Sequence, residues 1–168
     1  MSTTIRPGAG AARAQQAPDL RDCGPQGCAL DWLSSQRHEA EVDDVMEFTR
    51  FAMERGWVDG LPLIPPTEAR VRAFLAGNNR HADEAICALP PLNAPCTVEK
   101  IAINAVMAGA PAESMPLIIA ALEAMAHPDF ELFGLNATTA PVVPLTLVNG
   151  PVRNRLDIPC RHGCLGGA

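Results

Sequence analysis

The sequence predicts an α+β fold of about four helices with a few short strands toward the C-terminus. Four segments carry apolar residues at spacings of three and four positions, and each lies between residues that begin or end helices. Near the C-terminus this periodicity gives way to a β-branched apolar run that a turn sequence ends. Hydrophobic residues make up 48% of the 168-residue chain and aromatic residues only 4%, so we expect one domain with an aliphatic core.

The first two helices are expected at Glu39–Arg55 and Glu68–Ala76. Acidic residues crowd the first turn of the earlier segment, as the helix dipole favours, and Gly56 follows its last residue. Thr67 is a favourable N-cap for the second segment, and Gly77 is expected to end it.

Two further helices are expected after Thr97 and after Ser114. The earlier one has a stripe of alanine and β-branched residues suited to burial, and we expect it to stop at Gly109. The later one, Met115–Ala126, is apolar on nearly all sides and ends before His127. We therefore expect Met115–Ala126 to be the central buried helix.

The predicted strands follow these helices. Pro144–Val148 is apolar and partly β-branched, and the turn sequence Asn149-Gly150 comes directly after it. Leu135–Thr139 is the candidate partner strand. The expected sheet therefore lies near the C-terminus of the chain.

The chain is expected to divide into a flexible leader at residues 1–30, a single α+β domain at 31–158 and a flexible cysteine-rich tail at 159–168. The leader is rich in Ala, Gly and Pro and lacks the apolar core of a secretory signal. The longest apolar stretch is too short to span a bilayer. We therefore expect a cytoplasmic protein with no membrane partner, whose cysteines are mostly reduced.

Charge and motifs exclude several classes of function. The net charge is −6 and no cluster of Lys and Arg occurs, which argues against nucleic acid as a partner. The sequence contains no P-loop, dinucleotide-binding glycine fingerprint, serine nucleophile elbow or HExxH motif. The cofactor, if the protein uses one, is therefore unknown.

Two proline-rich segments precede helices in the same way. "LPLIPPT" leads into Thr67, and "LPPLNAPCT" leads into Thr97. Both segments should be extended, because proline fixes its own φ and disfavours helix in the residue before it. They are either stiff straps that line the core or rigid walls of a pocket. Cys87 and Cys96 lie in and around the second segment and are expected to be buried thiols.

Three charged residues are candidates for catalysis. Asp59 or Glu99 could act as general acid or base, and Lys100 could hold an anionic group. Lys100 shares a helix face with Asn104, four residues later. If that face points inward, Lys100 is a buried cation that needs an anionic partner, and it could serve as base or nucleophile. The alternative is an exposed lysine in the first turn of a helix.

Five polar residues are candidates for binding a substrate. Their amide and hydroxyl groups lie among apolar neighbours and could bind the oxygens of a small polar ligand. In the alternative interpretation the same groups cap the local backbone. The five are Asn104, Asn136, Thr138, Thr139 and Asn149.

The sequence favours no metal site. Cys160, His162 and Cys164 offer three soft ligands within five residues, whereas a structural zinc site needs four. Cys23 and Cys28 could complete such a set, which leaves a metal-binding alternative open.

Three longer segments resemble a known family when they are taken together. They are "GWVDGLPLIPPTEARV", "LPPLNAPCTVEKIAINAVMAGAPAESMPLIIAALEAM" and "ATTAPVVPLTLVNGP". They resemble a bacterial family of uncharacterised proteins that is grouped with short (seleno)cysteine-Gly-Ser-Cys (UGSC-type) proteins. The resemblance covers residues 56–158 and implies no particular reaction. It implies a fold about twice as long, so this chain looks truncated at its C-terminus and would be the N-terminal half.

Three hypotheses of function follow. The first is a subunit or half-domain of a cytoplasmic enzyme that acts on a small polar metabolite, with thiol-linked redox chemistry as one option. The second is a non-catalytic assembly subunit, or an inactive fragment whose apolar surface needs a partner. The third is a small metal-binding protein. The expected macromolecular partner is a second copy of the chain or a complementary chain.

Overall fold

The computed structural model describes residue 35 and residues 44–159. It confirms the α+β class, with more helices than the sequence predicted. The predicted leader and residues 160–168 of the tail lie outside the described residues. The elements are α1 (Val45–Glu54), α2 (Glu68–Ala76), β1 (Ala85–Leu89), β2 (Ala94–Thr97), α3 (Val98–Met107), η3 (Ala112–Ser114), α4 (Met115–Met125), η4 (Pro128–Phe130), α5 (Leu132–Ala137) and α6 (Pro151–Arg155).

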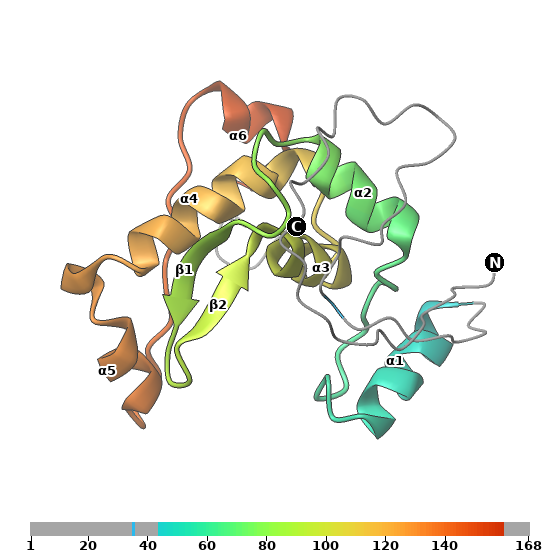
Figure 1. Cartoon of the computed structure of the whole chain (residues 1–168), viewed down its shortest axis with the longest axis horizontal. Helices are drawn as coiled ribbons and strands as arrows, with labels where there is room; N and C mark the ends of the chain where they lie inside the picture. Colours follow the sequence, from blue (N-terminus) through green and yellow to red (C-terminus); the bar gives the residue numbers. More distant parts are fainter. Residues whose placement is uncertain (1–34, 36–43, 160–168) are drawn as a thin grey trace.

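The core forms around α3, which contacts α2, α4 and the strand β2 (Figure 1). This helix supplies more buried side chains than any other described element, namely Val98, Glu99, Ile101, Ala102, Ala105 and Val106. The expectation that Met115–Ala126 is the central buried helix is therefore wrong. Only Met115 and Ile119 of α4 are buried, because α4 packs against the core along one side only.

The two threonine caps begin α2 and α3 at the predicted residues. Thr67 Oγ1 accepts a hydrogen bond from the Arg70 amide at 3.4 Å, and Thr97 Oγ1 accepts one from the Lys100 amide at 3.3 Å. Each hydroxyl satisfies a backbone donor that has no partner inside the helix. The prediction of Glu68–Ala76 is confirmed at both ends.

The first helix is shorter than predicted. Asp44 has an extended backbone and accepts a hydrogen bond from the Glu47 amide at 2.8 Å, so it is the N-cap of α1 and not a residue within it. Residues 39–43 of the expected helix lie outside the described residues. The boundary was misplaced because acidic residues are favourable both as N-caps and in the first turn.

The first proline-rich segment lines the core, as one of the two interpretations required. The Leu63 amide donates to Thr49 Oγ1 at 3.0 Å, and the Ile64 amide donates to the Met107 carbonyl at 3.1 Å. Ile64 also packs against the core cluster. These contacts fasten the segment to both α1 and α3.

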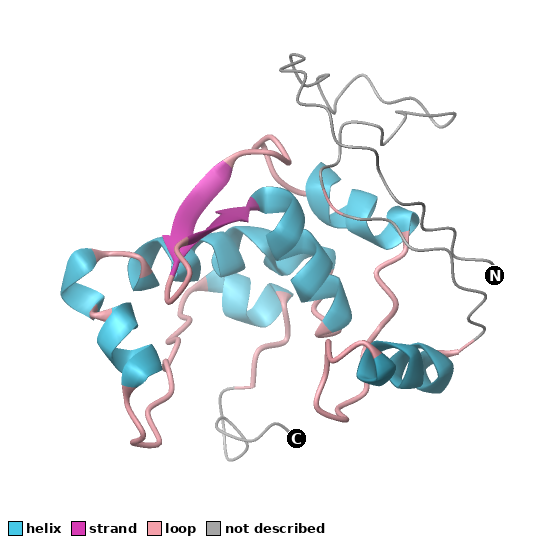
Figure 2. Cartoon of the chain, turned by 60° about the horizontal axis from the view of Figure 1, so that its bottom comes forward, coloured by secondary structure: helices cyan, strands magenta, loops and turns pink. Residues whose placement is uncertain are grey.

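The second proline-rich segment is not a strap but an antiparallel β-hairpin. In it, β1 pairs with β2, and Cys87, Ala88 and Leu89 lie opposite Cys96, Pro95 and Ala94. Residues 90–93 form the turn, in which Asn93 has a left-handed backbone with φ of 50°. Within the described residues this hairpin is the only sheet (Figure 2).

The predicted C-terminal strands are absent from the described residues. Leu132–Ala137 forms the helix α5, which overlaps the expected strand at Leu135–Thr139. Residues 138–149 form no helix or strand and run from α5 to α6 beside α4 (Figure 1). The run at Pro144–Val148 has the composition of a strand, but a strand also needs a neighbour to pair with, and the hairpin lies elsewhere.

Candidate functional site

The three predicted catalytic residues differ in their environments, since Glu99 is buried whereas Asp59 and Lys100 are exposed. Asp59 is exposed in the loop after α1. Lys100 is exposed on α3, where its Nζ donates to the Pro95 carbonyl at 3.1 Å. Asn104 is exposed on the same face and donates to the Lys100 carbonyl at 2.8 Å. The shared face therefore points outward, and the interpretation of Lys100 as a buried cation is wrong.

Glu99 is the one charged side chain that is buried among the described residues, with 1% of its surface exposed. Its Oε1 accepts a hydrogen bond from the backbone amide of Ser35 at 3.0 Å. The carboxylate lies in the first turn of α3, where the helix dipole favours a negative charge. These contacts describe a carboxylate that holds Ser35 against α3.

The predicted substrate-binding residues near the C-terminus are all exposed, namely Asn136, Thr138, Thr139 and Asn149. Asn136 Nδ2 donates to the Pro90 carbonyl at 3.3 Å, which links α5 to the hairpin turn. Thr138 Oγ1 accepts a hydrogen bond from the Ala140 amide at 3.1 Å. Thr138 therefore caps the local backbone, as the alternative interpretation required.

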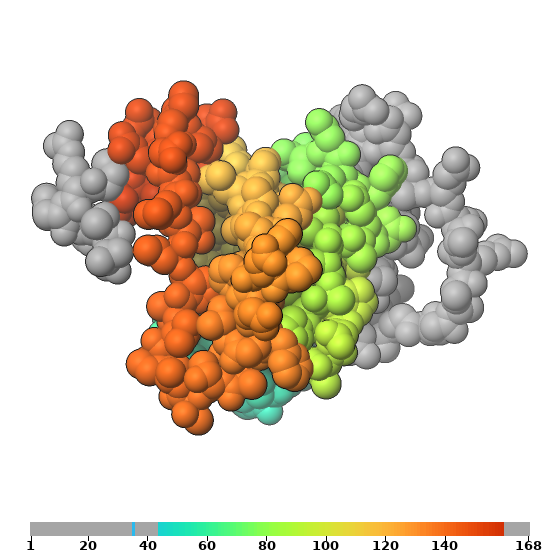
Figure 3. Space-filling model, turned by 90° about the vertical axis from the view of Figure 1, so that its left-hand side faces the viewer, coloured from blue at the N-terminus to red at the C-terminus, as the bar shows by residue number. Residues whose placement is uncertain are grey.

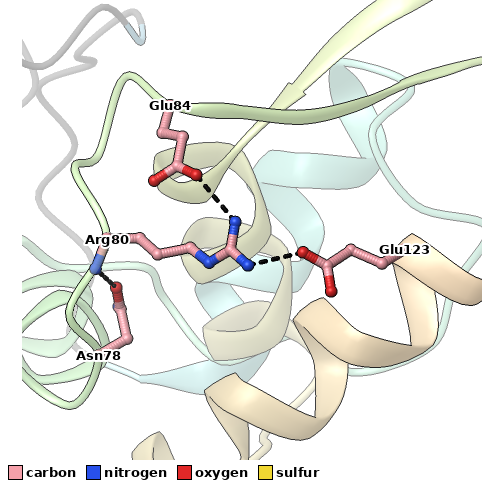
Figure 4. Close-up of polar contacts among 4 residues, drawn as sticks. All are labelled: Asn78, Arg80, Glu84 and Glu123. Carbon is pink, nitrogen blue, oxygen red and sulfur yellow. Dashed lines mark hydrogen bonds and ion pairs between the residues drawn. The ribbon is translucent and has the colours of Figure 1, made fainter.

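Arg80 forms a surface cluster that joins α4 to the segment before β1 (Figure 4). Its guanidinium donates to Glu84 Oε1 at 2.8 Å and to Glu123 Oε1 at 2.6 Å, while its amide donates to Asn78 Oδ1 at 2.8 Å. The hydrogen bond to Glu84, with the charges of both carboxylates, raises the pKa of Arg80. The cluster is exposed and fully paired, so we interpret it as a clamp between elements.

An apolar groove of about 400 Å³ lies between α4 and the C-terminal segments. A recess between the orange α4 and the redder C-terminal segments is visible in Figure 3. The groove offers few groups that could orient a polar metabolite. Its lining residues are Ala110, Pro111, Ser114, Leu117, Ile118, Ala121, Leu122, Met125, Thr146, Leu156 and Ile158.

An apolar row lies outside this groove, on residues 142–148. Val143, Leu145 and Leu147 are 81%, 71% and 83% exposed, whereas Thr146 lines the groove. Alternate residues of an extended chain point to opposite sides, so the three large side chains share the outer side. We name residues 142–148 the apolar strip. The composition of the strip was noted in the sequence, but its exposure was missed because a strand paired within the chain was expected.

The backbone of the strip is also open to association. Among the described residues, no backbone hydrogen bond joins residues 143–149 to another segment. The sequence from Leu132 to Val152 contains no Asp, Glu, Lys or Arg, although the chain carries a net charge of −6. Within the described part of the chain, residues 143–148 of the strip thus combine backbone groups that have no partner in another segment, exposed apolar side chains and the absence of charge.

Among the described residues, no group of three or more His, Cys, Asp or Glu side chains could hold a metal ion, and no described helix is long and apolar enough to cross a membrane. The candidate ligands Cys160, His162 and Cys164 lie outside that part of the chain.

Comparisons with protein-family models, with curated proteins and with solved structures yield no match. The resemblance to the family grouped with UGSC-type proteins, and any enzymatic activity, therefore stay predictions.

Proposed function

We propose that this chain is an assembly subunit that pairs with a second copy of itself through the apolar strip. The observation that carries the proposal is the exposed row Val143, Leu145 and Leu147 within an uncharged stretch. The enzymatic hypothesis has less support, because its candidate residues other than Glu99 are exposed and the groove beside α4 is apolar.

Burial of the strip supplies the driving force for pairing. Taking one Val or Leu side chain out of water stabilises the buried state by about 1.5–3 kcal/mol. A two-fold axis brings the same residues from both copies together, so every side chain in the strip contributes twice. Contiguous exposed apolar surface of this kind is typical of sites of protein association.

Charge favours a second copy over a differently charged partner. Two copies with a net charge of −6 repel each other over most of their surfaces. They can approach without local charge repulsion where the chain carries no charge, which is the stretch from Leu132 to Val152. A strongly basic partner would gain no electrostatic attraction from this stretch.

The backbone suits pairing of one strip with another. An extended segment with free amide and carbonyl groups can add to a second extended segment as a new strand. Pro144 has no amide hydrogen, so the continuous pairing region is Leu145–Val148. In an antiparallel pair related by a two-fold axis, Leu145–Val148 of one copy pairs with the same residues of the other copy.

Size-exclusion chromatography with light scattering over a wide range of protein concentration tests the proposal. We expect the parent chain to form a dimer and the double variant Leu145→Lys/Leu147→Lys to be a monomer with an unchanged circular dichroism spectrum. The lysines place two charges per copy at the contact.

Leu92→Lys is the matched control, since Leu92 is 86% exposed but lies in the hairpin turn. We expect this variant to remain a dimer. A parent chain that is monomeric at the highest concentration contradicts the proposal, and so does a Leu92→Lys variant that becomes monomeric.

A further inference from the structure

Cys87 and Cys96 face each other directly across the β-hairpin. They are register partners of β1 and β2. The pairing is regular from this pair to the turn, and an irregularity lies on the other side, between Ala85 and Cys87. Cys87 is half-buried, Cys96 is buried, and both are free thiols. Cys87 and Cys96 are the only cysteines among the described residues. Cys160 and Cys164, noted in the sequence, lie outside them.

Opposed residues of an antiparallel pair have a spacing that a disulfide can bridge. Their Cα atoms lie about 4.5 or 5.5 Å apart, depending on the hydrogen-bonding type of the pair. Disulfides span Cα separations of about 4.4–6.8 Å. The register therefore places the two cysteines at a separation that suits a disulfide.

The two thiols already interact. Burial raises the pKa of the Cys96 thiol, and both the charge of Cys87 and a hydrogen bond with its sulfur raise it further. The Lys100 ammonium acts in the opposite direction. The raised pKa disfavours ionisation of the Cys96 sulfur, and Cys87 is the more accessible residue of the two. This asymmetry suits a pair in which one thiol reacts first with an outside reagent and the other closes the bond.

We propose that Cys87 and Cys96 form a reversible dithiol–disulfide site that exchanges with low-molecular-weight disulfides. In the first step the Cys87 thiolate attacks one sulfur of the small disulfide, forms a mixed disulfide and releases one small thiolate. In the second step the Cys96 sulfur attacks Cys87 Sγ and expels the second small thiolate. The two cysteine protons end on the released thiols, so the protein loses two electrons and two protons and the small disulfide gains them.

The product would be a hairpin closed by a covalent bond between its strands. The site belongs to the folded core and not to the apolar strip, because Cys96 is part of the core cluster and Cys87 packs against it. The inference therefore stands independently of self-association.

Peptide mapping of the native full-length chain tests the site. Trypsin cleaves after Arg80 and Lys100, and the peptide between these cleavage points, His81–Lys100, contains both cysteines and no other. The folded protein is incubated with oxidised glutathione, quenched with acid, alkylated with iodoacetamide and digested without reductant. We expect the peptide to lose two hydrogens and both alkylation sites, and dithiothreitol to restore both.

Two single variants test the order of the steps. We expect Cys96→Ser to accumulate a glutathione mixed disulfide on Cys87, because the thiol that closes the bond is missing. We expect Cys87→Ser to react more slowly at Cys96, because that thiol is buried. Equal reaction at both positions would overturn the assigned order.

Three outcomes would overturn the site itself. They are a folded parent that keeps two alkylatable thiols under conditions that oxidise the urea-unfolded chain, a mixed disulfide that never closes, and a disulfide between two chains. The same experiment on Leu145→Lys/Leu147→Lys separates this inference from the proposed function. We expect that variant to form the internal disulfide as readily as the parent.

Discussion

Residues 67–119 and residues 120–159 are both rich in aliphatic side chains, but only the first region buries them. All members of the core cluster lie between Val71 and Ile119, and no described residue after Ile119 is buried. In the first region α2, α4 and the strand β2 all pack against α3. In the second region α4 offers one side to the core and the chain beyond it has little to pack against. Apolar composition therefore indicates that a segment is stabilised by burial. Whether it is buried within one chain depends on whether another element packs against it.

Truncating one leucine in each region should give the largest contrast. Leu75→Ala removes a side chain that is 1% exposed, and we expect a loss of about 2–5 kcal/mol in the free energy of unfolding. Leu147→Ala removes one that is 83% exposed, and we expect a change within about 0.5 kcal/mol in the monomer. Urea unfolding at a concentration below association measures both. Equal losses would remove the distinction between the regions.

Removing the buried Glu99 carboxylate should give the next largest loss in the free energy of unfolding. Glu99→Ala leaves the Ser35 amide without this acceptor inside the protein, and we expect a loss of about 1–3 kcal/mol. Glu113→Ala is the control, because Glu113 is exposed in η3 and should change the unfolding free energy little. Thermal or urea unfolding of both variants measures the difference. A Glu99→Ala chain as stable as the parent would contradict the structural role assigned here.

The helix caps should give the smallest contrast. Thr97→Ala removes the hydroxyl that caps α3, and we expect a loss of about 1 kcal/mol. Ser114 makes no such bond to α4, since its Oγ donates to the Pro111 carbonyl at 2.6 Å. We therefore expect Ser114→Ala to cost less than Thr97→Ala in urea unfolding. The reverse order would show that α4 depends on its N-terminus more than α3 does.

Local chemistry explains what the sequence predicted well. The starts of α2 and α3 follow from Thr67 and Thr97, because a threonine hydroxyl before an apolar periodic segment has a definite backbone donor to satisfy. The end of α2 follows from Gly77 in the same way. These signals act within four or five residues, so they do not depend on the contacts made by the rest of the chain.

The hairpin was missed because its turn is rich in proline. Pro90 and Pro91 suggested a continuous extended segment, whereas they lie in the turn beside Asn93, whose left-handed backbone reverses the chain. Asparagine tolerates that conformation, which was the available signal. Pro95 reinforced the error, although a two-stranded sheet has only edge strands and can accept proline.

The candidate site was predicted less well than the fold. Lys100 and Asn104 do share a helix face, but spacing does not say whether that face points inward. Burial depends on which elements surround α3, and those contacts join residues far apart in the sequence. The exposure of Leu145 and Leu147 was missed for the same reason, since a strand-like sequence does not reveal whether its partner belongs to the same chain.

The prolines of the C-terminal segment limit the number of copies that can associate. Pro141 lies just before the apolar strip and Pro144 lies within it, and both interrupt the row of amide donors. Fibrils grow when every backbone group of a segment pairs with the copy above and below it, and an interrupted row does not allow that. We therefore expect pairing through Leu145–Val148 to end in a closed dimer, with the prolines acting as a safeguard against amyloid growth.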